Sequence, residues 1–112
     1  MTAPEIGDII WVDFPFVETG QTKSRPALVV SEVLTAAGTP LIWVMMITNA
    51  AREPWSGDVL IEDYSGCGLP APSKVRSAKI ATIEIAQVER AGRIDAALLA
   101  KIQARLRTTL KL

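Results

Sequence analysis

Three consecutive residues, Lys23, Ser24 and Arg25, stand before the apolar run 27–30 and offer the first candidate chemistry in the chain. Such a run is typical of a buried strand, and the polar segment 17–24 is typical of an exposed loop. Arg25 is therefore expected at the mouth of a strand, beside a loop. A guanidinium presents donors in a planar fork that matches phosphate oxygens, so the pattern indicates a phosphate-binding position.

A second polar segment, 49–57, carries Arg52 and Trp55. Guanidinium and indole faces hold unpaired nucleobases by stacking, which favours contact with single-stranded nucleic acid. Trp55 fits a second interpretation equally well, as a core residue folded over the end of the sheet. Trp11 and Trp43 lie within apolar runs, which favours core packing for both.

Composition excludes several kinds of chemistry. The chain has no histidine, and Cys67 is its one cysteine. An intramolecular disulfide, a conventional Cys/His metal site and a histidine-assisted nucleophile are therefore ruled out. Cys67 lies in a Gly-rich turn without an acid, a base or a second Cys nearby, which predicts an inert thiol. Neither a long apolar run nor a signal-peptide pattern is present, so a cytoplasmic protein is expected.

The charges balance over the whole chain but not within it. Twelve basic and twelve acidic residues give a net charge of zero, which argues against a protein that coats nucleic acid non-specifically. Residues 1–60 contain three basic and seven acidic residues, whereas residues 61–112 contain nine basic and five acidic ones. The halves therefore carry −4 and +4, and a folded chain can still gather a local basic surface.

The length of 112 residues indicates a single domain, 1–112. Runs rich in β-branched and aromatic residues, separated by Gly, Pro and polar segments, predict mostly strands. The expected strands are 9–14, ended by Pro15, then 25–33, 41–48 and 58–62, with 73–77 and 79–83 as two short strands or one bent strand. Val75, Ile80 and Ile83 are the expected inward residues of the last pair.

One helix is expected at the C-terminal end. Asp95 is a good N-cap, and leucine and isoleucine recur at helical spacing from residue 98 to residue 110. Five or six short strands followed by one helix predict an α+β domain that is mostly β, with a strongly bent antiparallel sheet or partly open barrel packed against the helix.

Placed in this order, the motifs resemble the MazF/PemK family of toxins from toxin–antitoxin pairs, which includes Kid. The resemblance covers nearly the whole chain, and no single piece is specific alone. The matching pieces are residues 7–14, 25–31 and 47–48, then 68–69, 73–76, 81–83 and the segment from Gly92 into the helix.

The resemblance implies an SH3-like barrel, a homodimer, a cognate antitoxin partner, antitoxin-assisted DNA binding, and a sequence-selective endoribonuclease that cuts single-stranded RNA without metal or cofactor. The family reaction leaves a 2′,3′-cyclic phosphate and a 5′-OH. Its catalytic Arg falls on Arg25 and its catalytic Thr on Thr48. The residues expected to bind RNA are Lys23, Ser24, Asn49, Arg52, Arg76 and Lys79.

This chemistry suits the residue types with one tension. A fixed guanidinium and a hydroxyl donor stabilise the charge that builds on a phosphate under attack, as an oxyanion hole does. Free guanidinium keeps its proton up to a pH of about 12, so it is a poor base, and no His replaces it. Arg25 is therefore expected to act first as an electrostatic clamp.

One position departs from the Kid-like pattern. Kid-like members carry an Arg and then an acid two residues later on the same strand; Arg76 matches the Arg, but Ala78 stands in place of the acid. Lys79 beside it suits a phosphate contact, although it cannot act as a carboxylate base.

Two alternatives belong to other functional classes. CcdB-type toxins share the fold, bind DNA gyrase without catalytic residues and use a Trp near the extreme C-terminus. Residues 108–112 contain no Trp, which disfavours that function. A catalytically weak relative retained as a binding module is the other alternative, and Ala78 favours it.

Overall fold

The computed structural model describes residues 3–15 and 22–112, and most of their backbone lies in strands. The elements are β1 (Asp8–Pro15), β2 (Thr22–Val29), β3 (Leu34–Ala36), β4 (Thr39–Asn49), β5 (Asp58–Ile61), β6 (Ser73–Glu84), the 3-10 helix η1 (Ile85–Gln87), β7 (Glu89–Arg93) and α1 (Ala96–Leu110). The strands form one antiparallel sheet in the order β5-β6-β4-β2-β1-β7, and β3 pairs with β4. The expected fold class, α+β with mostly β, is confirmed.

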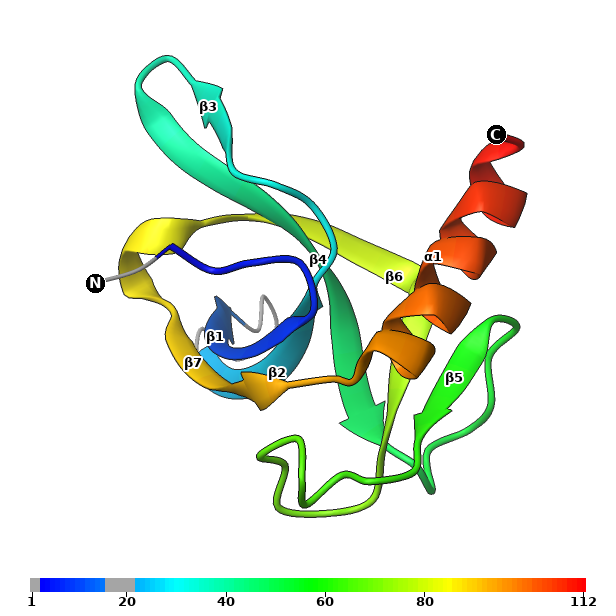
Figure 1. Cartoon of the computed structure of the whole chain (residues 1–112). Coiled ribbons are helices and arrows are strands. Elements are labelled where there is room, and N and C mark those ends of the chain that lie inside the picture. The colour runs from blue at the N-terminus through cyan, green and yellow to red at the C-terminus, as the bar shows by residue number, and fades with distance from the viewer. Residues whose placement is uncertain (1–2, 16–21) are drawn as a thin grey trace.

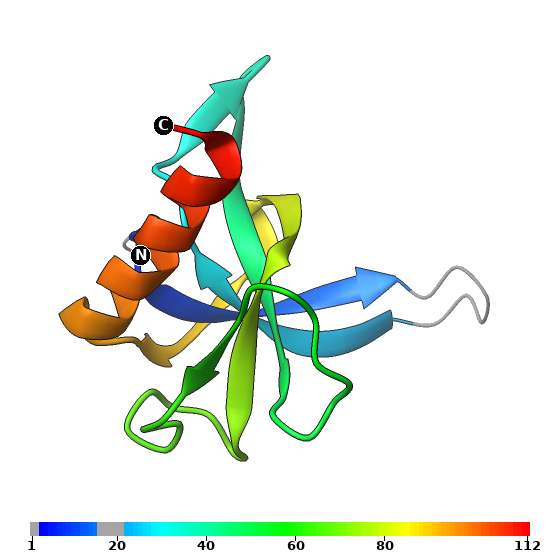
Figure 2. The ribbon, with the colours of Figure 1, turned by 90° about the vertical axis from the view of Figure 1, so that its right-hand side faces the viewer.

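Irregularities in the long strands bend this sheet. The β4–β6 register shifts between Met45 and Met46, and the β1–β7 register shifts between Ile9 and Ile10. A bulge of this kind increases local twist and turns a strand. Figures 1 and 2 show the result, a curled and partly open barrel with α1 standing against one side.

The helix begins as the sequence predicts. The Asp95 carboxylate accepts a hydrogen bond from the Leu98 N–H at 2.7 Å, which satisfies one of the free donors at the helix start. Ile102 is fully buried, and Leu98, Leu99 and Leu106 pack around it. The helix therefore presents one apolar stripe to the sheet.

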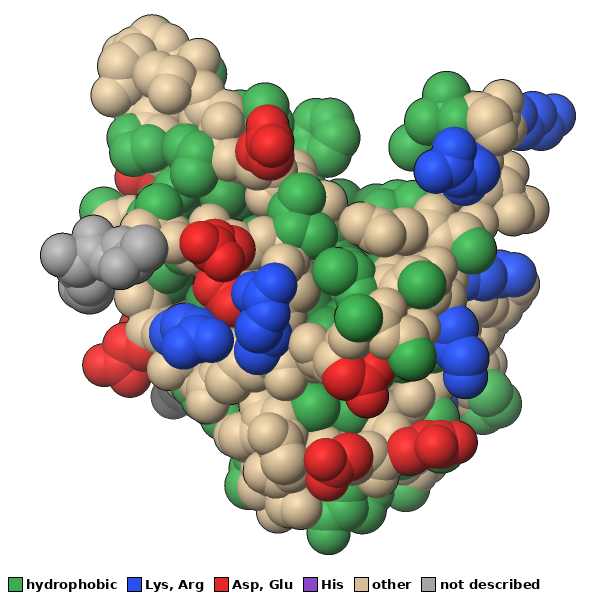
Figure 3. All heavy atoms as spheres, in the orientation of Figure 1, with side chains coloured by type: hydrophobic (Ala, Val, Ile, Leu, Met, Phe, Trp, Pro, Cys, Tyr) green, Lys and Arg blue, Asp and Glu red, His purple; other side chains and the backbone are tan. Residues whose placement is uncertain are grey.

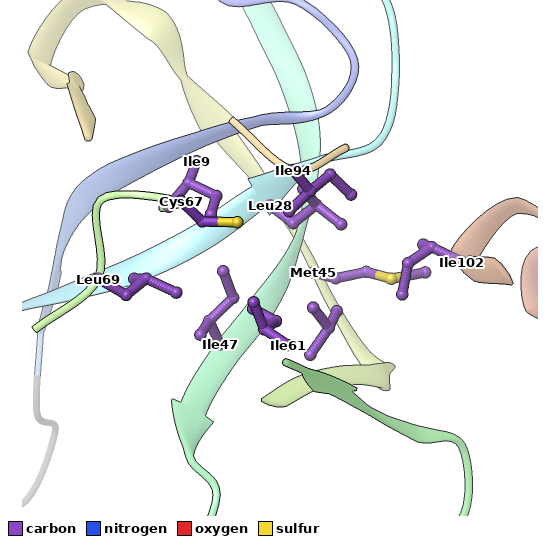
Figure 4. Packing of buried hydrophobic residues seen from close by; sticks show 10 residues of the cluster. Ile9, Leu28, Met45, Ile47, Ile61, Cys67, Leu69, Ile94 and Ile102 are labelled. Carbon is purple, nitrogen blue, oxygen red and sulfur yellow. The ribbon is translucent and has the colours of Figure 1, made fainter. Parts of the chain in front are cut away.

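Each face of the curled sheet has its own apolar cluster. The helix side joins strand residues to the 62–72 connection and to α1, as Figure 4 shows. Its buried members are Ile9, Leu28, Met45, Ile47, Ile61, Cys67, Leu69, Val75, Ile94 and Ile102. The opposite face is enclosed by the curl of the sheet and contains Ile10, Val12, Ala27, Val29, Ile42, Val44 and Met46.

Several strand predictions are corrected. The second strand covers Thr22–Val29 rather than 25–33, so residues 22–24 belong to a strand and not to the predicted loop, while residues 16–21 of that loop lie outside the described residues. Residues 73–83 form one bent strand, which was one of the two alternatives. The short strands β3 and β7 were not predicted.

Two apolar residues expected inside are exposed. The side chains of Trp43 and Ile80 are 47% and 47% accessible. Both lie on the helix-side face, because Trp43 alternates with Met45 and Ile47 along β4 and Ile80 pairs with Met45. Neither belongs to the buried cluster on that face. Alternation predicts the face correctly but not how far the helix extends over it.

Candidate functional site

Arg25 and Thr48 lie on two neighbouring central strands, β2 and β4. The last recorded pair of the β2–β4 register joins Ala27 to Met46, and each candidate residue lies two positions beyond that pair on its strand. Because strand side chains alternate between faces, both candidates share the face of the Ala27–Met46 pair. Both are half-buried and lie beyond the last pair of the β2–β4 register. Arg25 lies in the middle of β2 rather than at the mouth of the strand, where the sequence predicted it, because β2 begins at Thr22.

Two basic residues of β6 extend this face. The β4–β6 register pairs Thr48 with Lys74 and Met46 with Arg76. Directly opposed residues on antiparallel strands lie on the same face, so Lys74 shares the face that carries Thr48 and Arg25. The side chains of Lys74 and Arg76 are each only 8% accessible. Arg76 was predicted as a site residue, whereas Lys74 was not.

A single carboxylate neutralises part of this charge. Asp58 stands opposite Arg76 in the β5–β6 register, and its Oδ2 lies 3.2 Å from Lys74 Nζ and 3.3 Å from Arg76 Nη1. The Trp55 N–H donates to the same oxygen at 2.9 Å. Burial raises the pKa of Asp58, but the Trp55 N–H and the two cations outweigh burial, so its pKa is lowered. The cluster therefore carries one net positive charge at neutral pH.

The same cations tie down the backbone of the 49–57 loop. Lys74 Nζ donates to the Arg52 carbonyl at 2.6 Å, and Arg76 Nη2 donates to the Glu53 carbonyl at 2.9 Å. The Asn49 side chain accepts the Ala51 N–H at 2.8 Å, which closes the start of the loop. The two buried cations of β6 thus satisfy two backbone carbonyls of the loop.

Trp55 is positioned by this network. The Arg76 guanidinium carbon lies 4.1 Å from the centre of the Trp55 ring, and Lys79 Nζ lies 5.9 Å from it. The Trp55 side chain is 45% accessible, so the interpretation as a core residue is wrong. Cation–π contact on one side and accessible surface on the rest are what a base-stacking platform requires.

The remaining predicted site residues are dispersed. Ser24 pairs with Asp13 and lies on the face opposite to Arg25, where it is exposed. The Lys23 backbone lies in β2, but its side chain lies outside the described residues. The side chains of Asn49, Arg52 and Lys79 are also exposed, and Lys79 lies in the bulge of β6.

Asp58 and Lys74 are the residues that the sequence reasoning missed. Lys74 and Arg76 stand two residues apart on a predicted strand, and this spacing was a signal that they share a face. Asp58 had no such signal, because its position beside them follows from the β5–β6 register.

The described part of the chain gathers no group of three or more His, Cys, Asp or Glu side chains that would hold a metal ion. None of its helices is long and apolar enough to cross a membrane.

The chain matches a known protein family and several solved structures. A family model described as a PemK-like, MazF-like toxin of type II toxin–antitoxin systems matches residues 5–110. The chain is similar to the crystal structure of MazF from Deinococcus radiodurans, with 20% identity, a TM-score of 0.71 and 100% of both chains covered. It is also similar to a MazE–MazF crystal structure from that organism, with 20% identity, a TM-score of 0.71, and 100% of this chain and 99% of that chain covered.

A third similar structure is an endoribonuclease in complex with its cognate antitoxin from a mycobacterial species. It is 21% identical, with a TM-score of 0.68, and the match covers 100% of this chain and 97% of that chain. At these identities the similarity shows the fold. The search of curated protein sequences found no match.

Proposed function

The chain belongs to the PemK-like, MazF-like toxins of type II toxin–antitoxin systems, and from that premise we propose that it cuts single-stranded RNA as a metal-independent endoribonuclease. The observation that supports the proposal is the placement of Arg25 and Thr48 on one face of two neighbouring strands. A guanidinium and a hydroxyl on one face suit the oxygens of one phosphodiester.

In the proposed reaction the ribose 2′-oxygen attacks the adjacent phosphorus. A bond from the 2′-oxygen to phosphorus forms, the bond from phosphorus to the 5′-oxygen breaks, and one proton passes overall from the 2′-OH to the departing 5′-oxygen. The products are a 2′,3′-cyclic phosphate and a 5′-OH. Arg25 stabilises the negative charge that builds on the non-bridging oxygens, and Thr48 donates a hydrogen bond to the same group.

In the proposed complex, further residues on this side of the sheet bind the RNA on either side of the cleaved phosphate. Arg52 and Lys79 are exposed cations near Trp55, and they suit contacts with flanking phosphates. Trp55 offers its accessible surface to an unpaired base. Single-stranded RNA is therefore a better fit than a duplex, whose bases are already stacked.

We also propose a homodimer that a cognate antitoxin covers in the cytoplasm. Large apolar side chains are exposed on the β3–β4 hairpin, on the helix-side face and at the end of α1: Leu34, Trp43, Ile80, Leu110 and Leu112. Figure 3 shows hydrophobic side chains along the notch between the hairpin and the end of the helix. A surface of this kind suits burial against a second copy. The solved relatives with bound antitoxin support the antitoxin partner.

The test is cleavage of a long single-stranded RNA in excess EDTA. The unmodified protein is compared with Arg25→Ala and with Arg107→Ala, a control that removes an exposed guanidinium from the helix. The expected result is cutting at one short recurring sequence, with 2′,3′-cyclic phosphate ends, by the unmodified protein and the control only. Removal of a main electrostatic stabiliser should slow cleavage by about 100-fold or more.

Other outcomes would redirect the assignment. Intact RNA from a folded protein would refute the ribonuclease, and DNA damage with intact messages on expression would support a gyrase-directed toxin instead. Equal cutting by Arg25→Ala would refute the role given to Arg25 while leaving the nuclease in place.

A further inference from the structure

We propose that Asp58 is the positioning residue that fixes the 49–57 loop, and with it Arg52 and Trp55. The loop is held against Lys74 and Arg76, on the face of the sheet that carries Thr48. Its consequence for RNA rests on the proposed ribonuclease function. Asp58 does not touch the RNA in this proposal; it acts through Lys74 and Arg76 and through one backbone amide.

Three side chains hold the loop: Lys74, Arg76 and Asp58. Asp58 also forms ion pairs with the other two. Lys74 binds the Arg52 carbonyl, Arg76 binds the Glu53 carbonyl, and Asp58 itself accepts the Trp55 N–H. Each contact fixes the backbone of a different loop residue. All three side chains are nearly buried, at 8%, 8% and 11% accessible, so their own conformations are restricted.

The charge count makes Asp58 the essential member. Two cations lie within 3.3 Å of one carboxylate oxygen, and the other oxygen is buried without a recorded partner. Without the carboxylate, two neighbouring positive charges would remain buried, which is strongly unfavourable. Moving the loop aside would let water reach both charges, so loss of the carboxylate should release the loop rather than leave it in place.

Asp58 also supplies a carboxylate to Arg76, which has no acid two residues later on its own strand β6. Ala78 stands where a carboxylate was looked for two residues after Arg76, and it is exposed. Asp58 reaches the same guanidinium from the neighbouring strand β5. The counter-charge of Arg76 is thus supplied across the sheet rather than along the strand.

The test combines amide hydrogen exchange with cleavage kinetics on the full chain. Asp58→Ala removes both the charge and the acceptor, and Asp58→Asn removes the charge but keeps an acceptor for the Trp55 N–H. Glu62→Gln, an exposed acid just after β5, is the matched control. Exchange is followed by NMR at the amides of Arg52 and Trp55, with strand amides of β2 and β4 as internal references.

The expected result is local. In Asp58→Ala the Trp55 amide exchanges about ten-fold faster or more, while the β2 and β4 amides stay protected. For RNA cleavage, KM rises about ten-fold and kcat falls much less, because a binding loop is lost and Arg25 and Thr48 are not. Asp58→Asn shows the same KM effect if charge is the cause, and Glu62→Gln shows neither change.

Unchanged exchange at Trp55 in a folded Asp58→Ala variant would overturn the proposal. Faster exchange in all strands would assign Asp58 to general stability and would also overturn it. A fall in kcat with KM unchanged would show that Asp58 acts on the reacting groups, against the proposal. If the unmodified protein cuts no RNA, the proposed function fails, but the exchange pattern still decides whether Asp58 fixes the loop.

Discussion

Asp8→Asn should weaken the attachment of the edge strand β7 to β1. Asp8 opens β1, its side chain is 5% accessible, and its Oδ1 lies 3.2 Å from Arg90 Nε and 2.8 Å from Arg93 Nη1, both on β7. Its Oδ2 accepts the Glu5 N–H at 2.8 Å. One carboxylate therefore ties the start of β1 to the neighbouring edge strand β7.

The structure sets the magnitude. A hydrogen bond to a charged group contributes about 1.5–3 kcal/mol when it is protected from water. The Arg90 and Arg93 side chains are 61% and 45% accessible, and screening reduces each pair to about 0.5–1 kcal/mol. Asn keeps an acceptor for the Glu5 N–H but loses its charge, which adds about 0.5 kcal/mol. We expect a loss of about 2 kcal/mol in the free energy of unfolding.

The assay is urea denaturation near neutral pH at one fixed protein concentration, because association would otherwise change the apparent stability. Asp13→Asn is the control, since Asp13 is an exposed acid of the same strand. The control should change stability by less than about 0.5 kcal/mol. An equally small change in Asp8→Asn would refute the view that this carboxylate holds β7 in place.

The pH dependence gives an independent check of sign. Burial raises the pKa of Asp8, but the Glu5 N–H, Arg93 and Arg90 outweigh burial, so the pKa of Asp8 lies below the usual value for an aspartate. The native state then binds fewer protons than the unfolded state. The stabilisation is present above the unfolded pKa and is lost as the pH falls through the lower folded value. The difference in the free energy of unfolding between Asp8→Asn and the unmodified protein should therefore become smaller below about pH 4. A difference that does not change with pH would contradict the assigned cause.

Two further substitutions separate chemistry from assembly. Thr48→Val preserves shape but removes the hydroxyl, so kcat should fall about 100-fold with the protein still folded; steady-state cleavage measures this, and an unchanged kcat would remove Thr48 from the reaction. Trp43→Ser should shift the protein from dimer to monomer in light scattering after size exclusion, because Trp43 is a large exposed apolar side chain, whereas Leu60→Ser at the sheet edge should not. A dimer that survives Trp43→Ser would place the interface elsewhere.

Elements that depend on local pattern could be predicted from the sequence. The helix follows from an N-cap at Asp95 and an apolar stripe, and both are local signals. The central strand β4 follows from an apolar run with buried residues on both faces. The placement of Thr48 near the end of β4 follows from the same run. The placement of Arg25 does not, because β2 begins at Thr22 and Arg25 lies in its middle.

Elements that depend on distant partners could not be predicted. The strand β7 contains Glu89, Arg90 and Arg93, a composition that does not favour a strand, and it is held by pairing with β1 and by Asp8. The Asp58 cluster likewise exists because β5 and β6 pair in one register, which brings a carboxylate beside two cations from another strand. Single-sequence patterns carry the faces of strands but not the register between them.

In the proposed ribonuclease, the burial of Arg76 limits how this residue can take part in RNA binding. A cation that meets RNA phosphates directly has to expose its donors, yet this guanidinium is 8% accessible and is bound by Asp58, the Glu53 carbonyl and the Trp55 ring. Its donors are directed at the protein. In the proposed ribonuclease, Arg76 would therefore contribute to RNA binding through Trp55, whose ring it contacts, and the exposed cations Arg52 and Lys79 would contact phosphate. The basic residues of the proposed site thus divide into a buried one that holds Trp55 in place and exposed ones that can contact RNA directly.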